Sequence, residues 1–137
     1  MVHALKLVHG LLRPRGRLVN ILSLPVPHMI AVHAAGKVIQ AGWVTDRQDF
    51  AEERSALGAL AQIVAEGDFQ FVEERDFIFN NYAEDLPALQ DWLADWWESA
   101  ILPDVTLQRA VDILQQVGPA SKVVISSSAR MTMLSAL

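Results

Sequence analysis

The chain has 137 residues, which is the usual size of one folded domain. Apolar residues make up 52% and charged residues 20%, so the composition predicts a packed core and excludes a disordered or collagen-like chain. Lys and Arg number 11 against 16 Asp and Glu, and the net charge of −5 argues against a nucleic-acid partner. There is no cysteine, which excludes disulfides and thiolate chemistry. We expect one cytoplasmic domain over 1–137.

No segment predicts a signal peptide or a membrane span. Residues 1–12 have helical apolar spacing, but His3 and Lys6 interrupt them and no small-residue cleavage site follows. The most apolar stretch, 18–35, contains Asn20 together with prolines and histidines, whereas a bilayer span needs about 20 predominantly apolar residues. We therefore expect no membrane partner.

The first elements predicted are a helix and a strand. Leucine and valine recur at helical spacing over 2–12, and Pro14 ends that pattern. Residues 18–24, from Leu18 to Leu24, are almost continuously apolar. Such a run is typical of a strand buried on both faces, as in a parallel sheet.

The next elements predicted are a β-hairpin and a second helix. Residues 29–32 and 37–44 flank a turn in which Gly36 supplies a positive φ. Asp49 is placed to cap a helix over 50–66, whose apolar stripe starts at Phe50 and ends before Gly67. The remaining elements expected are a long or broken strand with one solvated face over 69–79, a helix that Asp85 caps, a helix between Pro103 and Gly118, and a last strand over 122–134.

The second half contains a cluster of tryptophans and a run of three serines. For both, the sequence favours a structural role over a functional one. In the helix after Asp85, Trp92 and Trp96 fall on one buried stripe, whereas Trp97 lies off the stripe and is the ring expected to reach a partner. The three serines at 126–128 have no His and Asp order suited to a nucleophile, so we expect them to mark an edge or a tight crossing.

Residues 7–19, LVHGLLRPRGRLV, connect the first helix to the first strand. They resemble the helix, the LRPGGRL turn and the fifth strand of class I S-adenosylmethionine-dependent methyltransferases. Pro14 ends the helix and Gly16 allows the turn. Arg15 stands where the family has the first glycine of its pair, so it must adopt a negative φ or accept strain. The order of the later elements is also similar to the C-terminal half of that family, with a last strand antiparallel between its two predecessors.

The resemblance implies an α/β chain with a partial Rossmann-like methyltransferase fold: the C-terminal strands, flanking helices and a β-hairpin, without the N-terminal cofactor-binding half. S-adenosylmethionine is the cofactor implied, but no G-x-G-x-x-G is present, so we expect none to bind to this chain alone. The function expected is that of a truncated methyltransferase-like protein, inactive as an isolated chain, with a small-molecule acceptor if active. The alternative is a non-enzymatic dimerisation or protein-binding module, so whether the chain is an enzyme stays open.

Three residues are candidates for facing a substrate. Ser23 and His28 would emerge at the carboxyl end of the strand over 18–24, where the family places such residues, and Trp97 is the third. The alternative for His28 is an ordinary loop histidine, and His28 and His33 lack a third metal ligand. We assign no catalytic, cofactor-binding or metal-binding residue.

The strand over 18–24 also has no neighbour in sequence that could pair with its other edge. An unpaired apolar edge promotes association with another chain. We therefore expect a homodimer, or a partner that covers the strand between Leu18 and Leu24.

Overall fold

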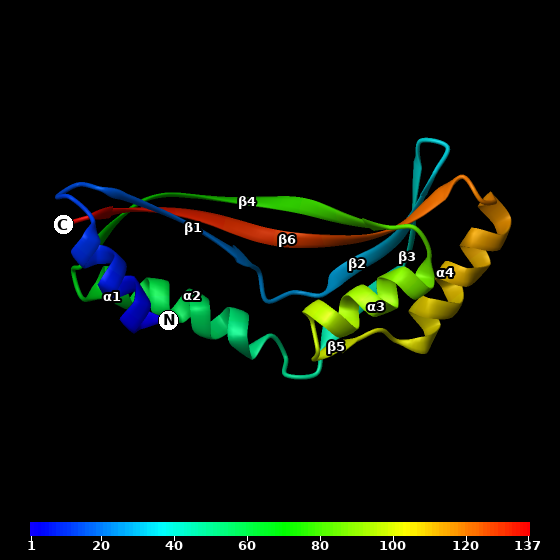
Figure 1. Cartoon of the computed structure of the whole chain (residues 1–137), viewed down its shortest axis with the longest axis horizontal. Coiled ribbons are helices and arrows are strands. Elements are labelled where there is room, and N and C mark those ends of the chain that lie inside the picture. Colours follow the sequence, from blue (N-terminus) through cyan, green and yellow to red (C-terminus); the bar gives the residue numbers. More distant parts are fainter. The chain divides into compact units, whose positions relative to one another are not determined.

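The computed structural model describes all of residues 1–137. The protein is α/β, with four helices and six strands in one open antiparallel sheet (Figure 1). Its elements in chain order are α1 (Val2–Leu11), β1 (Arg17–Ser23), β2 (His28–Ala34), β3 (Lys37–Asp46), α2 (Ala51–Ala65), β4 (Phe69–Ala83), α3 (Leu86–Trp96), β5 (Ala100–Ile101), α4 (Asp104–Val117) and β6 (Ser121–Ala136). None of the four helices combines the length and the hydropathy that a membrane span requires.

The last strand, β6, organises the sheet. The strand order is β1-β6-β2-β3-β5, and β4 pairs with β6 as well. β1 runs antiparallel to β6, with Leu18 opposite Leu134. Contacts between β4 and β6 also run in opposite directions along the chain, through Glu84 with Lys122, Asn80 with Ser126 and Asp76 with Arg130. The expectation of a last strand antiparallel between two predecessors, β1 and β4, is confirmed. The expectation of a parallel sheet around residues 18–24 is wrong, because the only neighbour of β1 is antiparallel.

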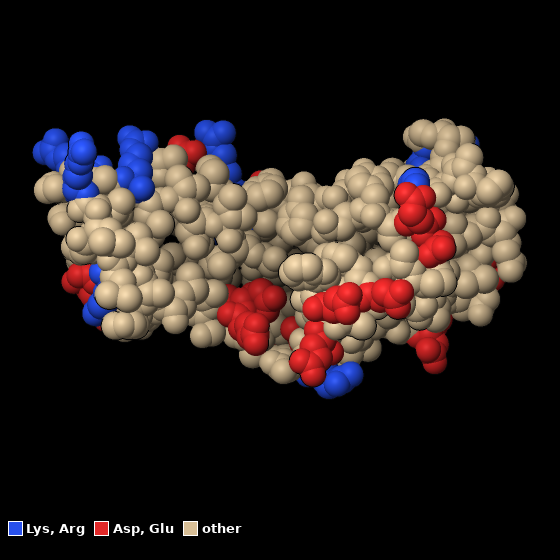
Figure 2. All heavy atoms as spheres, viewed as in Figure 1, with Lys and Arg blue, Asp and Glu red and all other residues tan.

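The chain forms two compact units. Unit 1 comprises 1–25, 51–77 and 128–137, and unit 2 comprises 26–50 and 78–127, so β4 and β6 contribute to both. Unit 1 has seven Lys and Arg and seven Asp and Glu, whereas unit 2 has four against nine, so unit 2 carries the whole net charge of −5. Figure 2 shows basic side chains over the α1–β1 turn and acidic ones over α3.

In unit 1, α1 and α2 cover one face of β1, β4 and β6. The core contains Leu5 of α1 and Ile63 of α2, packed with Phe69 and Leu134 of the sheet. The other face of β1 is open, and Val19 and Ile21 are 50% and 60% exposed. The prediction that this strand is buried on both faces is therefore wrong. An apolar run indicates that a strand can be buried, but only the helices that pack on it decide which face is.

In the turn between α1 and β1, Arg15 accepts backbone strain instead of adopting a negative φ. Arg15 has a φ of 62°, in the left-handed region that a side chain disfavours. Its N–H donates to the carbonyl of Ala136 at 3.0 Å, which holds it beside the end of β6. The N–H of Gly16 donates to the carbonyl of Arg13 at 2.7 Å, and a Cβ at Gly16 would meet that same oxygen at 2.7 Å. Glycine is therefore required at the second position of the turn.

In unit 2, α3 and α4 pack on the β2–β3 hairpin and on β6. The hairpin is confirmed, and its two turn residues, Ala35 and Gly36, both have positive φ, as a type I′ turn requires. Asp85 caps α3 as predicted, accepting the N–H of Ala88 at 2.8 Å. The core comprises residues from all of these elements: Ile30, Val32, Ala41, Val44, Leu86, Leu89, Leu93, Ala110, Ile113, Val123 and Ile125.

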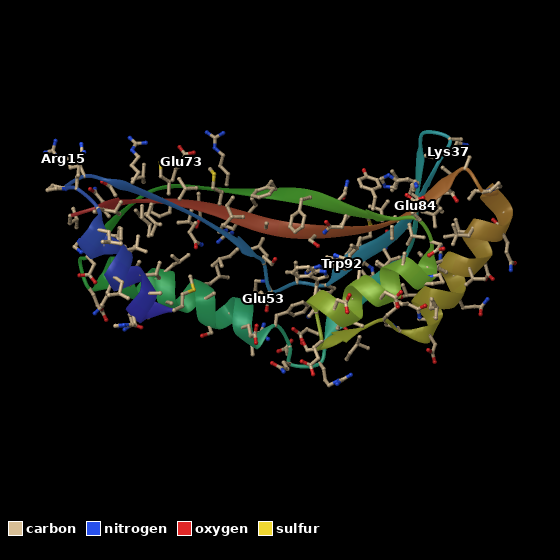
Figure 3. The ribbon with its side chains drawn as sticks, viewed as in Figure 1. Arg15, Lys37, Glu53, Glu73, Glu84 and Trp92 are labelled. Atoms are coloured by element: carbon tan, nitrogen blue, oxygen red, sulfur yellow. The ribbon has the colours of Figure 1, made fainter.

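Two helix ends differ from the expectations. Asp49 and Phe50 have φ of 53° and 57°, so the backbone before α2 is not the extended backbone of an ordinary cap, and Phe50 lies outside the apolar stripe of the helix. Trp96 is 78% exposed, whereas Trp97 is half-buried. α3 ends at Trp96 and Trp97 leaves helical geometry, so helical spacing places neither ring correctly. Figure 3 shows Trp92 between α3 and the strands, as its place on the stripe predicts.

Candidate functional site

The first candidate site is built around His28, at the start of β2. The strand register places Met29 opposite Ser126, so the preceding residue, His28, meets Ser127 across the ladder. Both side chains are buried, and His28 Nδ1 lies 2.8 Å from Ser127 Oγ. The order of residues along the chain does not show that a histidine lies beside Ser127. Strand pairing brings together residues that are 99 positions apart.

Two aromatic rings close over this pair. Phe50 stacks on His28 with ring centroids 6.3 Å apart and planes 12° apart, and Trp97 packs on it with centroids 4.6 Å apart. Two of the three predicted substrate-facing residues, His28 and Trp97, are therefore in contact. However, His28 is only 8% exposed, so the rings shield it from any substrate in this arrangement.

Asp46 holds both rings in position. Its carboxylate accepts the N–H of Gln48 at 2.7 Å and the indole N–H of Trp97 at 3.4 Å. Burial alone would raise the pKa of Asp46, but hydrogen bonds from Gln48, Ser99, Trp97 and the backbone of Phe50 lower the pKa overall. The carboxylate thus organises the loop that carries Phe50 and orients the indole of Trp97.

The imidazole of His28 is enclosed, and its surroundings favour the neutral form. Burial lowers the pKa of His28, and the charge of Asp46 only partly opposes that effect. Its Nε2 is buried and has no hydrogen-bonding partner. No carboxylate bonds to the ring, and Ser127 is only 2% exposed, so the pair lacks the oriented base and open nucleophile that acyl transfer needs. The cluster is a packed polar contact within the core of unit 2.

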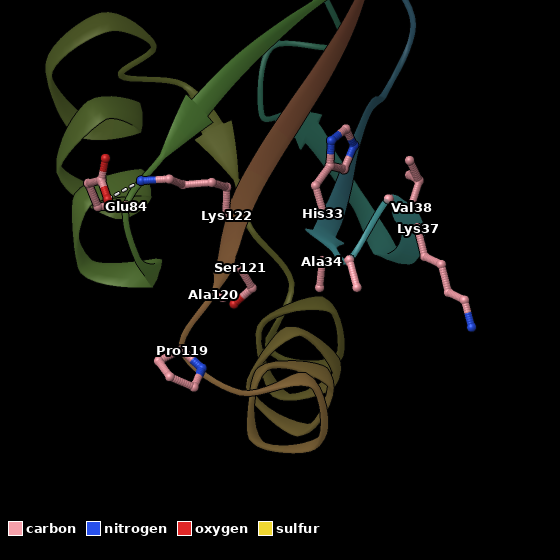
Figure 4. Close-up of a pocket in the computed structure, with 11 residues that line it drawn as sticks. His33, Ala34, Lys37, Val38, Glu84, Pro119, Ala120, Ser121 and Lys122 are labelled. Carbon is pink, nitrogen blue, oxygen red and sulfur yellow. Dashed lines mark hydrogen bonds and ion pairs between the residues drawn. The ribbon is translucent and has the colours of Figure 1, made fainter.

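A second candidate is a pocket of about 410 Å³ beside the hairpin turn. It is lined by His33, Lys37, Glu84 and Lys122 among others. Figure 4 shows Lys122 paired with Glu84 and Lys37 directed away from that pair, so the two cations do not converge on one ligand position. No group of three His, Asp or Glu side chains is placed to hold a metal ion.

A third candidate is a cavity of about 520 Å³ in unit 1, between α2 and the strands. Leucine, valine and alanine side chains of α2 form one wall, and Phe71, Arg130 and Thr132 lie on the sheet side. Arg130 bonds to Asp76 through Nε at 2.7 Å and Nη2 at 2.9 Å, so its guanidinium is already engaged. The cavity is an apolar hollow with no uncommitted charge directed into it.

The remaining candidate, Ser23, lies at the end of β1 opposite Ala129. β1 is a terminal strand of the sheet and pairs only with β6. Two hydrogen bonds at its ends, Leu24 N–H to Ser128 and Ala136 N–H to Gly16, show that even-numbered residues bond to β6. In an antiparallel ladder the bonding direction alternates, so the N–H and C=O groups of Arg17, Val19, Ile21 and Ser23 point to the free edge.

The outer edge of β1 lacks most of the features that keep the edge strands of monomeric proteins from pairing with other chains. Natural edge strands carry charges, prolines or bulges that discourage pairing. β1 has a regular register and no proline, its one charged residue is Arg17 at the first position, and Val19 and Ile21 are exposed. β1 thus offers both unpaired backbone groups and apolar side chains to another strand. Sequence reasoning missed how many of its groups are free, because the bonding direction of each residue follows from the register with β6.

No protein-family model, curated protein or solved structure matches this chain. The methyltransferase resemblance therefore depends on the α1–β1 turn and on the order of the elements.

Proposed function

We propose that this chain is a methyltransferase-like scaffold that works as a non-enzymatic assembly module, pairing its β1 edge with a strand of another chain. The observation that carries the proposal is the free edge of β1, with exposed Val19 and Ile21 beside unpaired backbone groups. Pairing would satisfy those groups and remove apolar surface from water.

The arrangement of unit 1 supports the scaffold part of the proposal. β1 and β4 run in the same direction on opposite sides of β6, and α2 lies between them in the chain. This is the order expected from the resemblance of residues 7–19 to the methyltransferase turn and fifth strand.

The chemistry available supports the non-enzymatic part. The 137 residues contain no glycine-rich turn between a strand and a helix that could hold S-adenosylmethionine, and His28 and Ser127 are buried. Methyl transfer to a small molecule would therefore require the cofactor-binding half to come from elsewhere. Calorimetric titration of the assembled chain with S-adenosylmethionine separates the two functions. We expect no heat of binding, and a saturable Kd near 1 µM, about −8 kcal/mol, would overturn the non-enzymatic assignment.

Sedimentation equilibrium tests the pairing. Val19→Lys places a charge on the exposed side of the edge, and Val105→Lys, on α4, is a matched control because Val105 is 75% exposed. We expect the wild type and Val105→Lys to associate at about 1 to 100 µM, and Val19→Lys to associate at least about tenfold more weakly. A wild-type chain that stays monomeric over that range, or a Val19→Lys variant that associates normally, would contradict the proposal.

A further inference from the structure

We infer that the partner of β1 is the β1 strand of a second copy, paired antiparallel about a two-fold axis that passes through Asn20. This inference rests on the proposed function and names the partner and the register of that same edge. A two-fold axis normal to the sheet makes the interface self-complementary, as in most homodimers.

The bonding directions of β1 select this centre. The outward N–H and C=O groups belong to Arg17, Val19, Ile21 and Ser23. With Asn20 at the axis, Val19 lies opposite Ile21 of the second copy and Arg17 lies opposite Ser23. All four outward-facing residues then exchange backbone hydrogen bonds, and each residue of β1 has a partner.

The side chains also match in this register. Val19 and Ile21, both exposed in the single copy, cover one another on the open face. Leu18 and Leu22 meet on the face that the helices cover. Arg17 faces a serine rather than a second arginine, so no like charges oppose each other across the strands.

The amide of Asn20 provides an independent observation. Its Nδ2 is buried and has no hydrogen-bonding partner in the single copy. At the axis, Asn20 faces Asn20 of the second copy in a non-hydrogen-bonded pair, the position where opposing side chains approach most closely. If the side chain rotates towards the edge, each carboxamide can donate Nδ2–H to the oxygen of the other.

Neighbouring registers do not satisfy that amide. A centre at Val19 places Asn20 opposite Leu18, and a centre at Ile21 places it opposite Leu22. Each also leaves one end of β1 without a strand residue to pair with. Only the Asn20 centre gives the amide a polar partner and uses the whole strand.

The absence of cysteine makes the register measurable by cross-linking. Asn20→Cys places two thiols at the axis, where a Cα separation of about 4.5 Å suits a disulfide. Val19→Cys and Ile21→Cys should not link to themselves, because each lies opposite the other position. An equimolar mixture of these two variants should link under mild oxidation. This mixture leaves Asn20 unchanged, so the test does not depend on how Asn20→Cys folds.

The outcomes separate this inference from the proposed function. A disulfide dimer of Asn20→Cys, with linking of the Val19→Cys and Ile21→Cys mixture but not of either variant alone, supports the register. If the wild type associates in sedimentation but the mixture does not link, the register is wrong and the pairing of β1 with another chain stands. Efficient linking of Val19→Cys to itself would indicate a centre at Val19 instead. A wild type that never associates overturns the inference together with the proposed function.

Discussion

Ser127 Oγ and His28 Nδ1 lie 2.8 Å apart in the core of unit 2, although the two residues are 99 positions apart in the chain. The bond joins β6 to β2 beneath the rings of Phe50 and Trp97. It is the only hydrogen bond that the imidazole makes, because Nε2 has no partner. The polar contact therefore depends on a single hydroxyl.

We predict that Ser127→Ala destabilises the protein by about 1 to 3 kcal/mol, because it leaves the second ring nitrogen of His28 buried without a partner. Ser126→Ala is the matched control. Ser126 bonds to Asn80 in an exposed position at 2.6 Å, so its loss should have an effect of about 0.5 kcal/mol or less. Urea unfolding of the three proteins measures both effects. Equal destabilisation by the two substitutions would show that the buried bond to His28 contributes no more to the free energy of unfolding than the exposed bond of Ser126.

The stability of the protein should fall in mild acid. Burial holds the pKa of His28 below its ordinary value of 6.5, so the unfolded chain takes up a proton at a higher pH than the folded chain. The contribution of neutral His28 is fully present above about pH 6.5 and is lost as the pH falls from there through the lower pKa of the folded state. Asp46, the carboxylate whose charge acts on His28, has a lowered pKa and stays ionised across that range.

Urea unfolding at about pH 7.5 and about pH 5.5 checks this prediction. The wild type should lose more stability between the two conditions than His28→Asn, which has no group titrating there. His3→Gln, a substitution at an exposed position of α1, should behave as the wild type. A pH dependence that is the same in wild type and His28→Asn would rule out this role of the imidazole.

Two glycines should respond in opposite ways to alanine. A Cβ at Gly42 would overlap Oγ1 of Thr106 and lie 2.9 Å from its Cγ2, and Thr106 bonds to the backbone of Trp43. Gly42→Ala should therefore destabilise by about 1 to 3 kcal/mol. A Cβ at Gly58, inside α2, would meet nothing within 4 Å, so Gly58→Ala should stabilise by about 0.5 to 1 kcal/mol.

A double-mutant cycle tests whether the contact with Thr106 causes the destabilisation expected from Gly42→Ala. Thr106→Ala removes the two closest atoms, so the double variant should be less destabilised than the sum of the two single variants. Thermal unfolding measures all four proteins. Strict additivity would mean that the contact with Thr106 is not what requires glycine at this position.

Local signals in the sequence predicted most of the elements. Pro14, the cap at Asp85 and the glycine at Gly36 each act within a few residues, and the structure places a helix end, a helix start and a hairpin turn at these positions. Such local signals do not predict which strands pair when they are far apart in the chain. The partnership of His28 with Ser127 depends on the register of two strands from distant parts of the chain.

The environment of β1 shows the same limit. Its apolar run predicts a strand but does not say that the neighbour is antiparallel or that only one face is covered. The sequence predicts a buried Trp96 and an outward-facing Trp97, whereas Trp96 is exposed and Trp97 is half-buried, and this difference has a more local cause. Where a helix ends, a shift of one residue reverses which side chain is buried, and apolar spacing does not locate that end to one residue.

Hydrogen exchange of the β1 amides, followed residue by residue, tests the pairing of this strand most directly. Leu18 and Leu22 bond to β6 and should be protected at every protein concentration, whereas Val19 and Ile21 point to the free edge. We predict that the Val19 and Ile21 amides are protected at about 100 µM and lose that protection on dilution below the dimer Kd. Rapid exchange of these two amides at every concentration, with Leu18 and Leu22 protected throughout, would contradict strand pairing at this edge.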